Sequence, residues 1–467
     1  MDVSFLQINN SFAGQNYLPY SAALLTSYFK TFSSASDEYD FKPFIYKRDS
    51  VNNLLLSNQH KIRLGLHRVN KAIKNLSLNT KYPSTNICTI NGTSGKNSII
   101  QILKNILIAH KKKYAAFYSP HLVSVTERFE HNKKFIKLAF LKKILLIVHK
   151  QKNLTQFEKL TIAFGLFIKN LNLDWVYGEF GLLGRKDSVR ALFPKPNLHI
   201  ISPISFDHLN WTKTKKMNLK TLKEIVFEKI FFLKSKLYIS KQTPLVLRLI
   251  KSNIKRNKNP KIIYGKDFKL IKKNKKYFYK DKIHKFEIKS NLLGEHMYEN
   301  ATVAIRIALD FKIPLKTIKA GLKRIEIPGR MQLIKKGKLR KGFSHKTVLI
   351  CDGAHNLNQS EQINKAISDK FKVKNKYCVI SMINTKDPRS FLKPFKNKFK
   401  KVYFVNMERE KNVFPKEKLK SIADGLNIKS ATANNLDDIK KDLKKSPCDL
   451  FLITGSLYFI GSILNKN

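Results

Sequence analysis

The chain has 467 residues, of which 43% are hydrophobic and 11% aromatic, and its 90 Lys and Arg against 33 Asp and Glu give a formal net charge of +57. This length exceeds what one hydrophobic core usually serves, so two domains are expected, and the apolar content excludes a disordered basic tail protein. The four cysteines lie scattered without a CxxC pair, which argues against a disulfide framework or a zinc site.

The positive charge has two interpretations. A polyanion-binding surface would explain it, so a nucleic-acid-binding module is one alternative. The basic residues are spread along the whole chain, however, and no stretch matches a helix-turn-helix or RNA-binding signature. We therefore interpret the charge as a compositional bias on solvated faces and do not expect nucleic acid as a partner.

The first part of the chain shows no targeting signal. The N-terminus lacks the basic start and apolar stretch of a secretory signal, and the longest apolar runs, such as 453–464, are shorter than a membrane span. A cytoplasmic protein without a membrane partner is expected. Residues 1–55 are polar and irregular apart from a predicted short helix at 20–32, and we interpret them as an N-terminal extension.

Strands and helices alternate along most of the remaining chain. Helical spacing at 62–76 precedes a short apolar strand at 87–90, which runs into a glycine-bearing loop. Further strands are predicted at 115–119, 174–180, 198–205, 347–353, 376–383, 401–407 and 449–455. Helical patterns lie between most of them, at 98–110, 156–170, 219–234, 296–310, 359–371 and 433–444. This order predicts an α/β fold with a parallel sheet and crossover helices.

Two segments interrupt this alternation. Residues 238–290 loosen into a Lys-rich pattern in which IIYGKDF and KYFYK look like strands, and this predicts a small antiparallel element on the first domain. The IEIPGR segment at 325–330 places a Pro-Gly pair between two α/β blocks, which is typical of a hinge. We therefore expect domains at 56–326 and 327–467.

The segment TINGTSGKNSII at 89–100 carries the strongest chemical signal. Gly92 and Gly95 would let the backbone wrap around phosphates, Lys96 could reach the terminal phosphates, and Ser98 could offer a hydroxyl to Mg²⁺. The segment departs from the ordinary Walker A pattern, which needs Ser or Thr directly after the Lys and a glycine where Ile90 stands. A strand-to-helix turn without a ligand is the alternative.

The loop, GTSGKNS in this chain, resembles the GTNGKGS of the folylpolyglutamate synthase/dihydrofolate synthase family in the Mur ligase superfamily. The resemblance continues in the family's order over residues 60–467, through YSPHLVSVTERF (118–129), YGEFGLLGRKDS (177–188), ISFDH (204–208), FEKIFF (227–232), LLGEHMYENATVAI (292–305), IPGRM (327–331), CDGAHN (351–356), NTKDP (384–388) and ITGSLYFIG (453–461). It implies a Mur-ligase-like P-loop ATPase domain followed by a smaller, Rossmann-like C-terminal domain.

The resemblance also implies the members of the site. ATP would contact Gly92, Thr93, Ser94, Gly95, Lys96, Asn97, Ser98, Asn300, Arg330, Asp352 and His355. Catalytic roles would belong to Lys96, Lys229, Arg330 and His355. Two magnesium ions would be held with the help of Ser98, Glu179 and His208. The acyl substrate would contact Tyr118, Ser119, Pro120 and His121.

Physical arguments support several of these assignments. Glu179 ends an apolar strand, where an α/β sheet presents ligands at its carboxyl edge, and Mg²⁺ prefers oxygen ligands. The guanidinium fork of Arg330 suits the charge that develops in phosphoryl transfer. Lys229 lies on an apolar helix, where desolvation favours the neutral amine, and the resemblance implies its carbamylation as a metal ligand. The alternatives are that Lys229 is a snorkelling surface lysine, that Glu179 is a solvated residue at a strand end, and that His208 is a turn residue.

Taken together, the resemblance implies an ATP-dependent ligase of folate biosynthesis and one-carbon metabolism. The γ-phosphoryl group of ATP would activate a carboxylate of dihydropteroate or of a reduced folate, and the amine of L-glutamate would attack the acyl phosphate. A monomer whose two domains close over ATP is expected. The sequence leaves open whether the enzyme makes dihydrofolate, extends folate tails or does both.

Several positions depart from the family pattern, among them Asn97, Leu183, Arg190, Met297 and Ile327. Asn97 replaces a loop glycine, and its side chain could narrow the site, although Asn tolerates left-handed backbone geometry better than most residues. These departures keep three other functions open. They are another amino-acid ligase of the Mur superfamily, a diverged nucleotide-binding relative without folate activity, and a non-catalytic scaffold.

Overall fold

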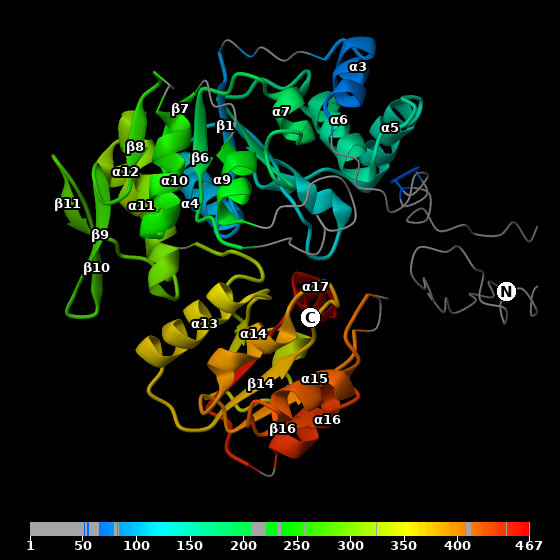
Figure 1. The fold of residues 1–467 in the computed structure, drawn as a ribbon, viewed down its shortest axis with the longest axis vertical. Coiled ribbons are helices and arrows are strands. Elements are labelled where there is room, and N and C mark those ends of the chain that lie inside the picture. Colours follow the sequence, from blue (N-terminus) through cyan, green and yellow to red (C-terminus); the bar gives the residue numbers. More distant parts are fainter. Residues whose placement is uncertain are drawn as a thin grey trace, which may run out of the picture.

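The computed structural model describes most of the chain after residue 64. The described residues are 51, 54–55, 65–78, 82, 84–206, 221–230, 235–255, 258–323, 325–407, 412–444 and 446–466. The helix expected at 20–32 and nearly all of the expected N-terminal extension lie outside them. The described chain forms two α/β units, one above the other in Figure 1, and a small antiparallel sheet.

The larger unit is built on an eight-stranded sheet in the order β4-β3-β2-β5-β1-β6-β7-β8. The pairs from β2 through β5, β1, β6 and β7 to β8 are all parallel, whereas β3 and β4 form an antiparallel edge. The strands are β1 (Asn86–Asn91), β2 (Tyr114–Phe117), β3 (Phe129–His131), β4 (Lys134–Phe135), β5 (Trp175–Glu179), β6 (Leu198–Ile201), β7 (Lys236–Ile239) and β8 (Lys261–Ile263). The central strand β1 is therefore buried between two parallel neighbours.

Helices cover both faces of this sheet. Side chains alternate between the faces, so that Ala116 of β2 joins one core cluster while Ala115 and Phe117 join another. The first cluster includes α4 (Lys96–Ala109), α11 (Glu295–Asp310) and α12 (Leu315–Leu322). The second includes α3 (His67–Asn75), α5 (Leu138–His149), α6 (Gln156–Ile168) and α7 (Ser188–Leu192), with the 3₁₀ helix η1 (Val125–Arg128) nearby. A third cluster lies under α9 (Leu222–Ile230) and α10 (Pro244–Ile254).

The Lys-rich region at 238–290 is only in part the antiparallel element that the sequence predicts. A three-stranded antiparallel sheet does form, from β9 (Phe268–Lys273), β10 (Lys276–Asp281) and β11 (Lys285–Glu287). The prediction is wrong for IIYGKDF, because its buried Ile262 and Ile263 belong to β8, which pairs parallel to β7 in the large sheet. Helix α10, capped by Thr243 through Val246 N, also lies within this region.

The smaller unit has a six-stranded sheet in the order β12-β13-β17-β14-β15-β16, parallel except for the edge strand β12. Its strands are β12 (Gln332–Leu333), β13 (Val348–Cys351), β14 (Lys376–Ile380), β15 (Lys401–Phe404), β16 (Ser430–Thr432) and β17 (Leu450–Thr454). Its helices are α13 (Leu357–Lys370), α14 (Pro388–Leu392), α15 (Lys416–Asp424), α16 (Leu436–Leu443) and α17 (Leu457–Leu464), with 3₁₀ turns η2 (Lys338–Arg340) and η3 (Lys393–Phe395). The α/β fold class is confirmed.

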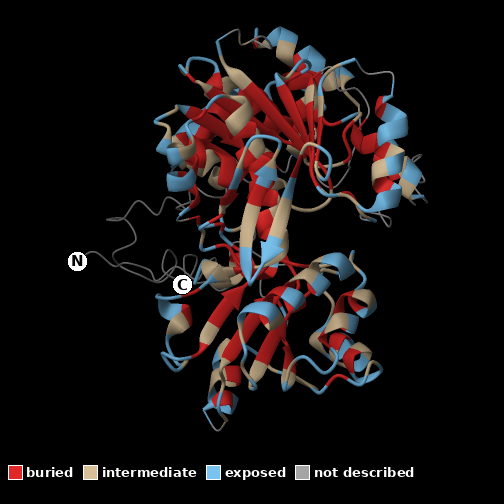
Figure 2. Cartoon of the chain, turned by 90° about the vertical axis from the view of Figure 1, so that its left-hand side faces the viewer, coloured by how far each residue is buried: buried red, intermediate tan, exposed pale blue. Residues whose placement is uncertain are grey.

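Each unit encloses its own buried layer, as Figure 2 shows by the red strands at the centre of each half. Ile327 still belongs to the core of the larger unit and Met331 to that of the smaller, so the chain crosses between the cores in the IPGRM segment. The division at residue 327 stays a prediction. Within the described residues, the helices are all too short or too polar to cross a membrane.

Candidate active site

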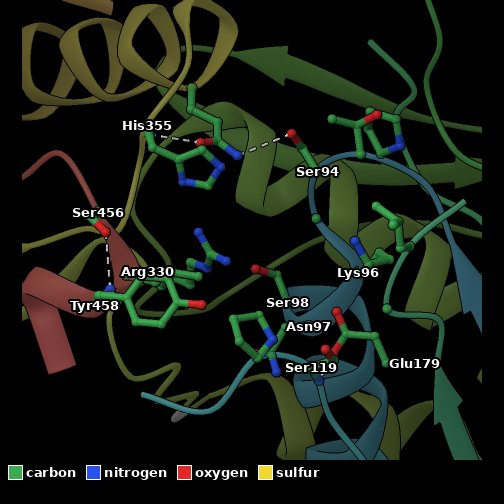
Figure 3. Close-up of a pocket in the computed structure, with 18 of the residues that line it drawn as sticks. Ser94, Lys96, Asn97, Ser98, Ser119, Glu179, Arg330, His355, Ser456 and Tyr458 are labelled. Carbon is green, nitrogen blue, oxygen red and sulfur yellow. Dashed lines mark hydrogen bonds between the residues drawn. The ribbon is translucent and has the colours of Figure 1, made fainter. Parts of the chain in front are cut away.

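A single cavity of about 810 Å³ is lined by residues of both units. From the phosphate loop to the C-terminal unit, most of the residues that the sequence predicts for the site line it: Thr93, Ser94, Gly95, Lys96, Asn97, Ser98, Ser119, Pro120, Glu179, Asn300, Arg330, Asp352 and His355. Gly92, Tyr118, His121 and Lys229 do not line it, and His208 lies outside the described residues. Figure 3 shows lining side chains of both units around this space, among them Lys96, Glu179 and Arg330.

The loop between β1 and α4 needs glycine at two positions. A Cβ on Gly92, whose φ is +142°, would lie 2.1 Å from Ser202 Oγ. A Cβ on Gly95, whose φ is +80°, would lie 2.9 Å from Asn300 Oδ1. Both glycines therefore permit an approach that no side chain could share. Gly95 is also the N-cap of α4, so the N-terminus of that helix faces the cavity as a ready site for phosphate.

Hydrogen bonds hold this loop against the segment that follows β6. The amides of Thr93 and Ser94 both donate to the carbonyl of Pro203, at 2.8 and 3.1 Å. The ammonium of Lys96 donates to the carbonyl of Gly92 at 3.3 Å. The phosphate loop is thus ordered by protein contacts alone.

The departures from the family pattern differ in their structural consequences. Asn97 lies in the first turn of α4 with no positive φ, so its tolerance of left-handed geometry is not needed. Leu183 is the strained position, because its buried side chain sits on a backbone with φ of +56°. Arg190 donates from Nη1 to the carbonyl of Arg185 and lies outside the cavity lining. Met297 is buried in the lining of the cavity.

Glu179 is a buried carboxylate beside three cationic side chains. It is 2% exposed, and its Oε2 accepts a hydrogen bond from Ser119 N at 3.2 Å. Burial raises its pKa, whereas the charges of Lys96, Arg330 and Arg128 act to lower it. Within the described residues it forms no ion pair. A buried carboxylate without a bonded cation is costly unless a ligand compensates it.

Glu179 and Ser98 together fit a hard cation. Both present oxygen atoms to the cavity, and Figure 3 shows Lys96, Ser98 and Glu179 on the same wall. Mg²⁺ takes one or two carboxylates and completes its coordination with water and phosphate oxygens. The donor chemistry of this wall therefore fits a magnesium ion.

On the opposite wall, Asp352 organises the start of the C-terminal unit. Its Oδ2 accepts from Met331 N at 2.7 Å and its Oδ1 from Ala354 N at 2.8 Å. Burial raises the pKa of this carboxyl, and the nearby charge of Arg330 opposes the shift. Asp352 thus fixes the segment that carries Arg330 against the turn that leads to His355. The Nδ1 atom of His355 lies 2.9 Å from the carbonyl of Gly353, which places the proton of the neutral ring on Nδ1.

The loop that the resemblance assigns to the acyl substrate, residues 118–121, is divided between the cavity and the core. Ser119 and Pro120, joined by a cis peptide bond, line the cavity. Tyr118 is buried beneath them in a core cluster. His121 accepts from Arg128 Nε at 2.9 Å, and burial, with a smaller effect of the Arg128 charge, lowers its pKa to about 3. His121 is therefore a neutral acceptor that orients Arg128.

Among the lining residues that the sequence did not assign to the site, Arg128 and Gln359 form hydrogen bonds within it. Arg128 is the last residue but one of the segment YSPHLVSVTERF (118–129), so the resemblance offered a signal for it. Gln359 also lines the cavity, and its Oε1 accepts from His355 N at 3.0 Å while its Nε2 donates to Ser94 Oγ at 3.3 Å. Only its place one turn after the CDGAHN motif could have indicated it. In the NTKDP motif, Lys386 lines the cavity. Its neighbour Asp387 caps α14 by accepting a hydrogen bond from Ser390 N.

Lys229 is buried behind the phosphate loop. Its side chain donates from Nζ to the carbonyl of Gly92 at 2.9 Å, and Asn91 Nδ2 donates to the carbonyl of Lys229 at 2.7 Å. At 5% exposure it is not a snorkelling surface lysine. Because Nζ faces a loop carbonyl and the residue does not line the cavity, its surroundings do not fit a carbamate that ligates a metal beside Ser98 and Glu179.

Comparisons with known proteins agree with this architecture, although no family model matches the chain. The dihydrofolate synthase/folylpolyglutamate synthase of Bacillus subtilis (strain 168) is 25% identical over 405 residues, which are 80% of this chain and 89% of that protein. FolC of E. coli in complex with DHPP and ADP superimposes with a TM-score of 0.76 at 21% identity, over 90% of this chain and 97% of that chain. The Yersinia pestis bifunctional folylpolyglutamate synthase/dihydrofolate synthase with AMPPNP and Mn gives 0.75 at 20% identity, over 90% and 97%.

A glycine-bearing loop at the end of β1 in a mostly parallel sheet, facing a second α/β unit across one cavity, is the Mur-ligase-like fold of these matched structures. Within that class of fold, the chain is similar to the dihydrofolate synthase/folylpolyglutamate synthases of Bacillus subtilis and E. coli.

Proposed function

We propose that this protein is an ATP-dependent ligase that adds L-glutamate to a carboxylate of dihydropteroate or of a reduced folate through an acyl phosphate. The observation that carries the proposal is the cavity, in which Lys96, Glu179 and Arg330 converge from two units. The relatives named for the two folate activities support the substrate class.

The phosphoryl-transfer step would use residues from both sides of the cavity. The α4 N-terminus and Lys96 hold the phosphates on one side, and Arg330 approaches from the other. An unactivated carboxylate does not react with an amine, because oxide is a poor leaving group. Transfer of the γ-phosphoryl group provides a better one, and the two cationic side chains stabilise the charge that develops.

Magnesium belongs to the proposal through Ser98 and Glu179. When bound, it would neutralise phosphate charge and polarise the transferred group. The Y. pestis relative was solved with Mn, which supports a divalent metal at such a site. A second metal and the participation of His208 stay predictions.

The acyl substrate would enter between the loop of Ser119 and Pro120 and the N-terminus of α6. This part of the cavity is lined by apolar Leu55 and Phe157 and by the basic side chain of Arg128. A flat aromatic ring system with a carboxylate at its end matches that combination of surfaces. The DHPP that binds E. coli FolC is consistent with this part of the proposal.

His355 and Asp352 are proposed to act on the nucleotide side of the C-terminal unit. The contact between Nδ1 of His355 and the carbonyl of Gly353, at 2.9 Å, orients the imidazole ring on this side of the cavity. Asp352 acts by holding Arg330 in place. We also propose that the protein is a cytoplasmic monomer and that its two domains meet near residue 327.

Phosphate release from ATP tests the function. Purified protein would be given Mg²⁺ and glutamate, with dihydropteroate or tetrahydrofolate in separate reactions and Lys96→Ala as control. Release that depends on one pterin, and disappears in the variant, identifies the acceptor. Another ligase of the Mur superfamily would release phosphate with neither pterin but with a different acid. A diverged relative or a scaffold would release none while still folded.

A further inference from the structure

Gln359 joins the two walls of the cavity through its side-chain amide. Its Nε2 donates to Ser94 Oγ in the phosphate loop at 3.3 Å, across 265 positions of sequence. Its Oε1 accepts from the backbone N–H of His355 at 3.0 Å. Figure 3 shows both bonds as dashed lines that converge on one side chain between Ser94 and His355.

Both ends of this connection are already ordered. The amide of Ser94 donates to Pro203 O at 3.1 Å, and its neighbour Gly95 has no room for a side chain beside Asn300. On the other side, Gln359 lies in the first turn of α13, where Asn356 Oδ1 accepts from its backbone N–H at 3.0 Å. A short side chain fixed at both ends determines the spacing between the segments that it joins.

The bond joins a hydroxyl and an amide, both of them uncharged. The family motif GTNGKGS, which this loop resembles, has Asn at the position of Ser94. The hydroxyl of Ser94 can rotate to accept the N–H of Gln359. The bond is neutral on both sides, so it adds no charge beside the phosphates. Its strength should therefore depend little on ionic strength.

We propose that Gln359 is a positioning residue that sets the separation of Ser94 and His355 across the cavity before the acyl acceptor binds. The proposal rests on the proposed function, since it assumes that a nucleoside triphosphate contacts both walls. Its consequence is selective. Loss of the bond weakens nucleotide binding and raises KM for ATP, while KM for the pterin is unchanged.

A double-mutant cycle tests this inference on the full chain, with a non-hydrolysable ATP analogue and Mg²⁺ in titration calorimetry. The variants are Gln359→Ala, Ser94→Ala and both together. Each single substitution should raise Kd about fivefold, the effect of one neutral hydrogen bond, and the double variant should bind no more weakly than either. Asn358→Ala, an exposed amide in the same helix turn that does not line the cavity, should bind like the parent.

Two results would overturn the proposal. One is a Gln359→Ala protein that binds the analogue as tightly as the parent. The other is a double variant whose loss equals the product of the two single losses, which would show that Ser94 and Gln359 act independently. Circular dichroism checks folding, and Gln359→Met, which keeps the side-chain length without the amide, repeats the test if the alanine variant does not fold.

The cycle is separate from the ligase assay. Coupled binding without pterin-dependent phosphate release would sink the proposed function and leave the positioning role. Phosphate release with independent single effects would sink the positioning role alone.

Discussion

The backbone amide of Ser119 donates to Oε2 of Glu179 at 3.2 Å, so the loop proposed to contact the acyl substrate is bonded to the proposed metal ligand. The position of this loop therefore depends on the position of the Glu179 carboxylate. A change at Glu179 should affect both the use of the metal and the placement of the acceptor carboxylate.

Glu179→Gln should abolish most ligase activity without unfolding the protein. The amide keeps an oxygen for Ser119 N but removes the charge that holds the cation, so we expect a loss on the order of 10²-fold or more in kcat/KM. Because Glu179 is buried without an ion pair in the described chain, the melting temperature of the ligand-free protein should stay the same or rise. Calorimetry with and without Mg²⁺ checks this, and exposed Glu361→Gln is the control. A large drop in ligand-free stability would contradict the assignment.

Gly95→Ala should lose nucleotide binding. The new Cβ would meet Asn300 Oδ1 at 2.9 Å on a backbone with φ of +80°, so loop and helix must shift apart. We expect a cost of about 1–3 kcal/mol in stability and at least a ~10-fold rise in Kd for ATP.

The matched control is Gly425→Ala. Gly425 has a φ of −66°, and a Cβ there would meet its nearest neighbours at 3.6 and 3.7 Å. It should bind ATP normally and be equally or slightly more stable, by about 0.4–1 kcal/mol. Equal ATP affinity of the two variants would refute the close approach at Gly95.

Asp187 should make the ligand-free protein less stable as the pH rises from about 4 to 6. Burial raises its pKa from 3.8 to about 6, although the amides of Gly181, Leu182 and Val189 bond its carboxylate and favour the charged form. The native state therefore binds more protons than the unfolded state in this window, and the free energy of unfolding falls with pH by up to ~3 kcal/mol. Urea unfolding at several pH values measures it. In Asp187→Asn this part of the slope should vanish, and an unchanged slope would contradict the prediction.

Lys229→Met should weaken the phosphate loop from behind. The substitution removes the donor to Gly92 O and leaves a side chain of similar length. A bond from a charged donor contributes ~1.5–3 kcal/mol, so nucleotide affinity should fall about 10- to 100-fold. Exposed Lys223→Met on the same helix is the control. Activity of the parent protein that rises with added bicarbonate would instead support the carbamate that the resemblance implies.

The order of strands and helices was predictable because apolar periodicity is strong where elements are buried on one or both faces. The strand at 87–90 and the helix at 98–110 agree with β1 and α4, and the loop between them lies where its glycines indicate. Helices α5 and α10 were not predicted, although their buried residues recur at helical spacing, as Val246, Ile250 and Ile254 do in α10. The parallel pairing of β8 depends on its neighbour β7, which no local pattern reveals.

The cavity itself was predictable only through motifs. Lys96, Glu179 and Arg330 were assigned to it from motifs and strand ends, and all three line it. Gln359 could not be assigned, because its role arises from the approach of two units that are far apart in sequence. The contact of Lys229 Nζ with the carbonyl of Gly92 could not be predicted either. The same helical periodicity would allow a buried lysine to face a ligand or a backbone carbonyl.

The cavity between the units also has a thermodynamic consequence. A molecule that contacts both walls binds only when the units are together, so its binding free energy also stabilises the association of two α/β cores, which we expect to melt separately without it. Saturating nucleotide should therefore merge two thermal transitions into one. With the ligand bound, the two cores would unfold as one cooperative unit.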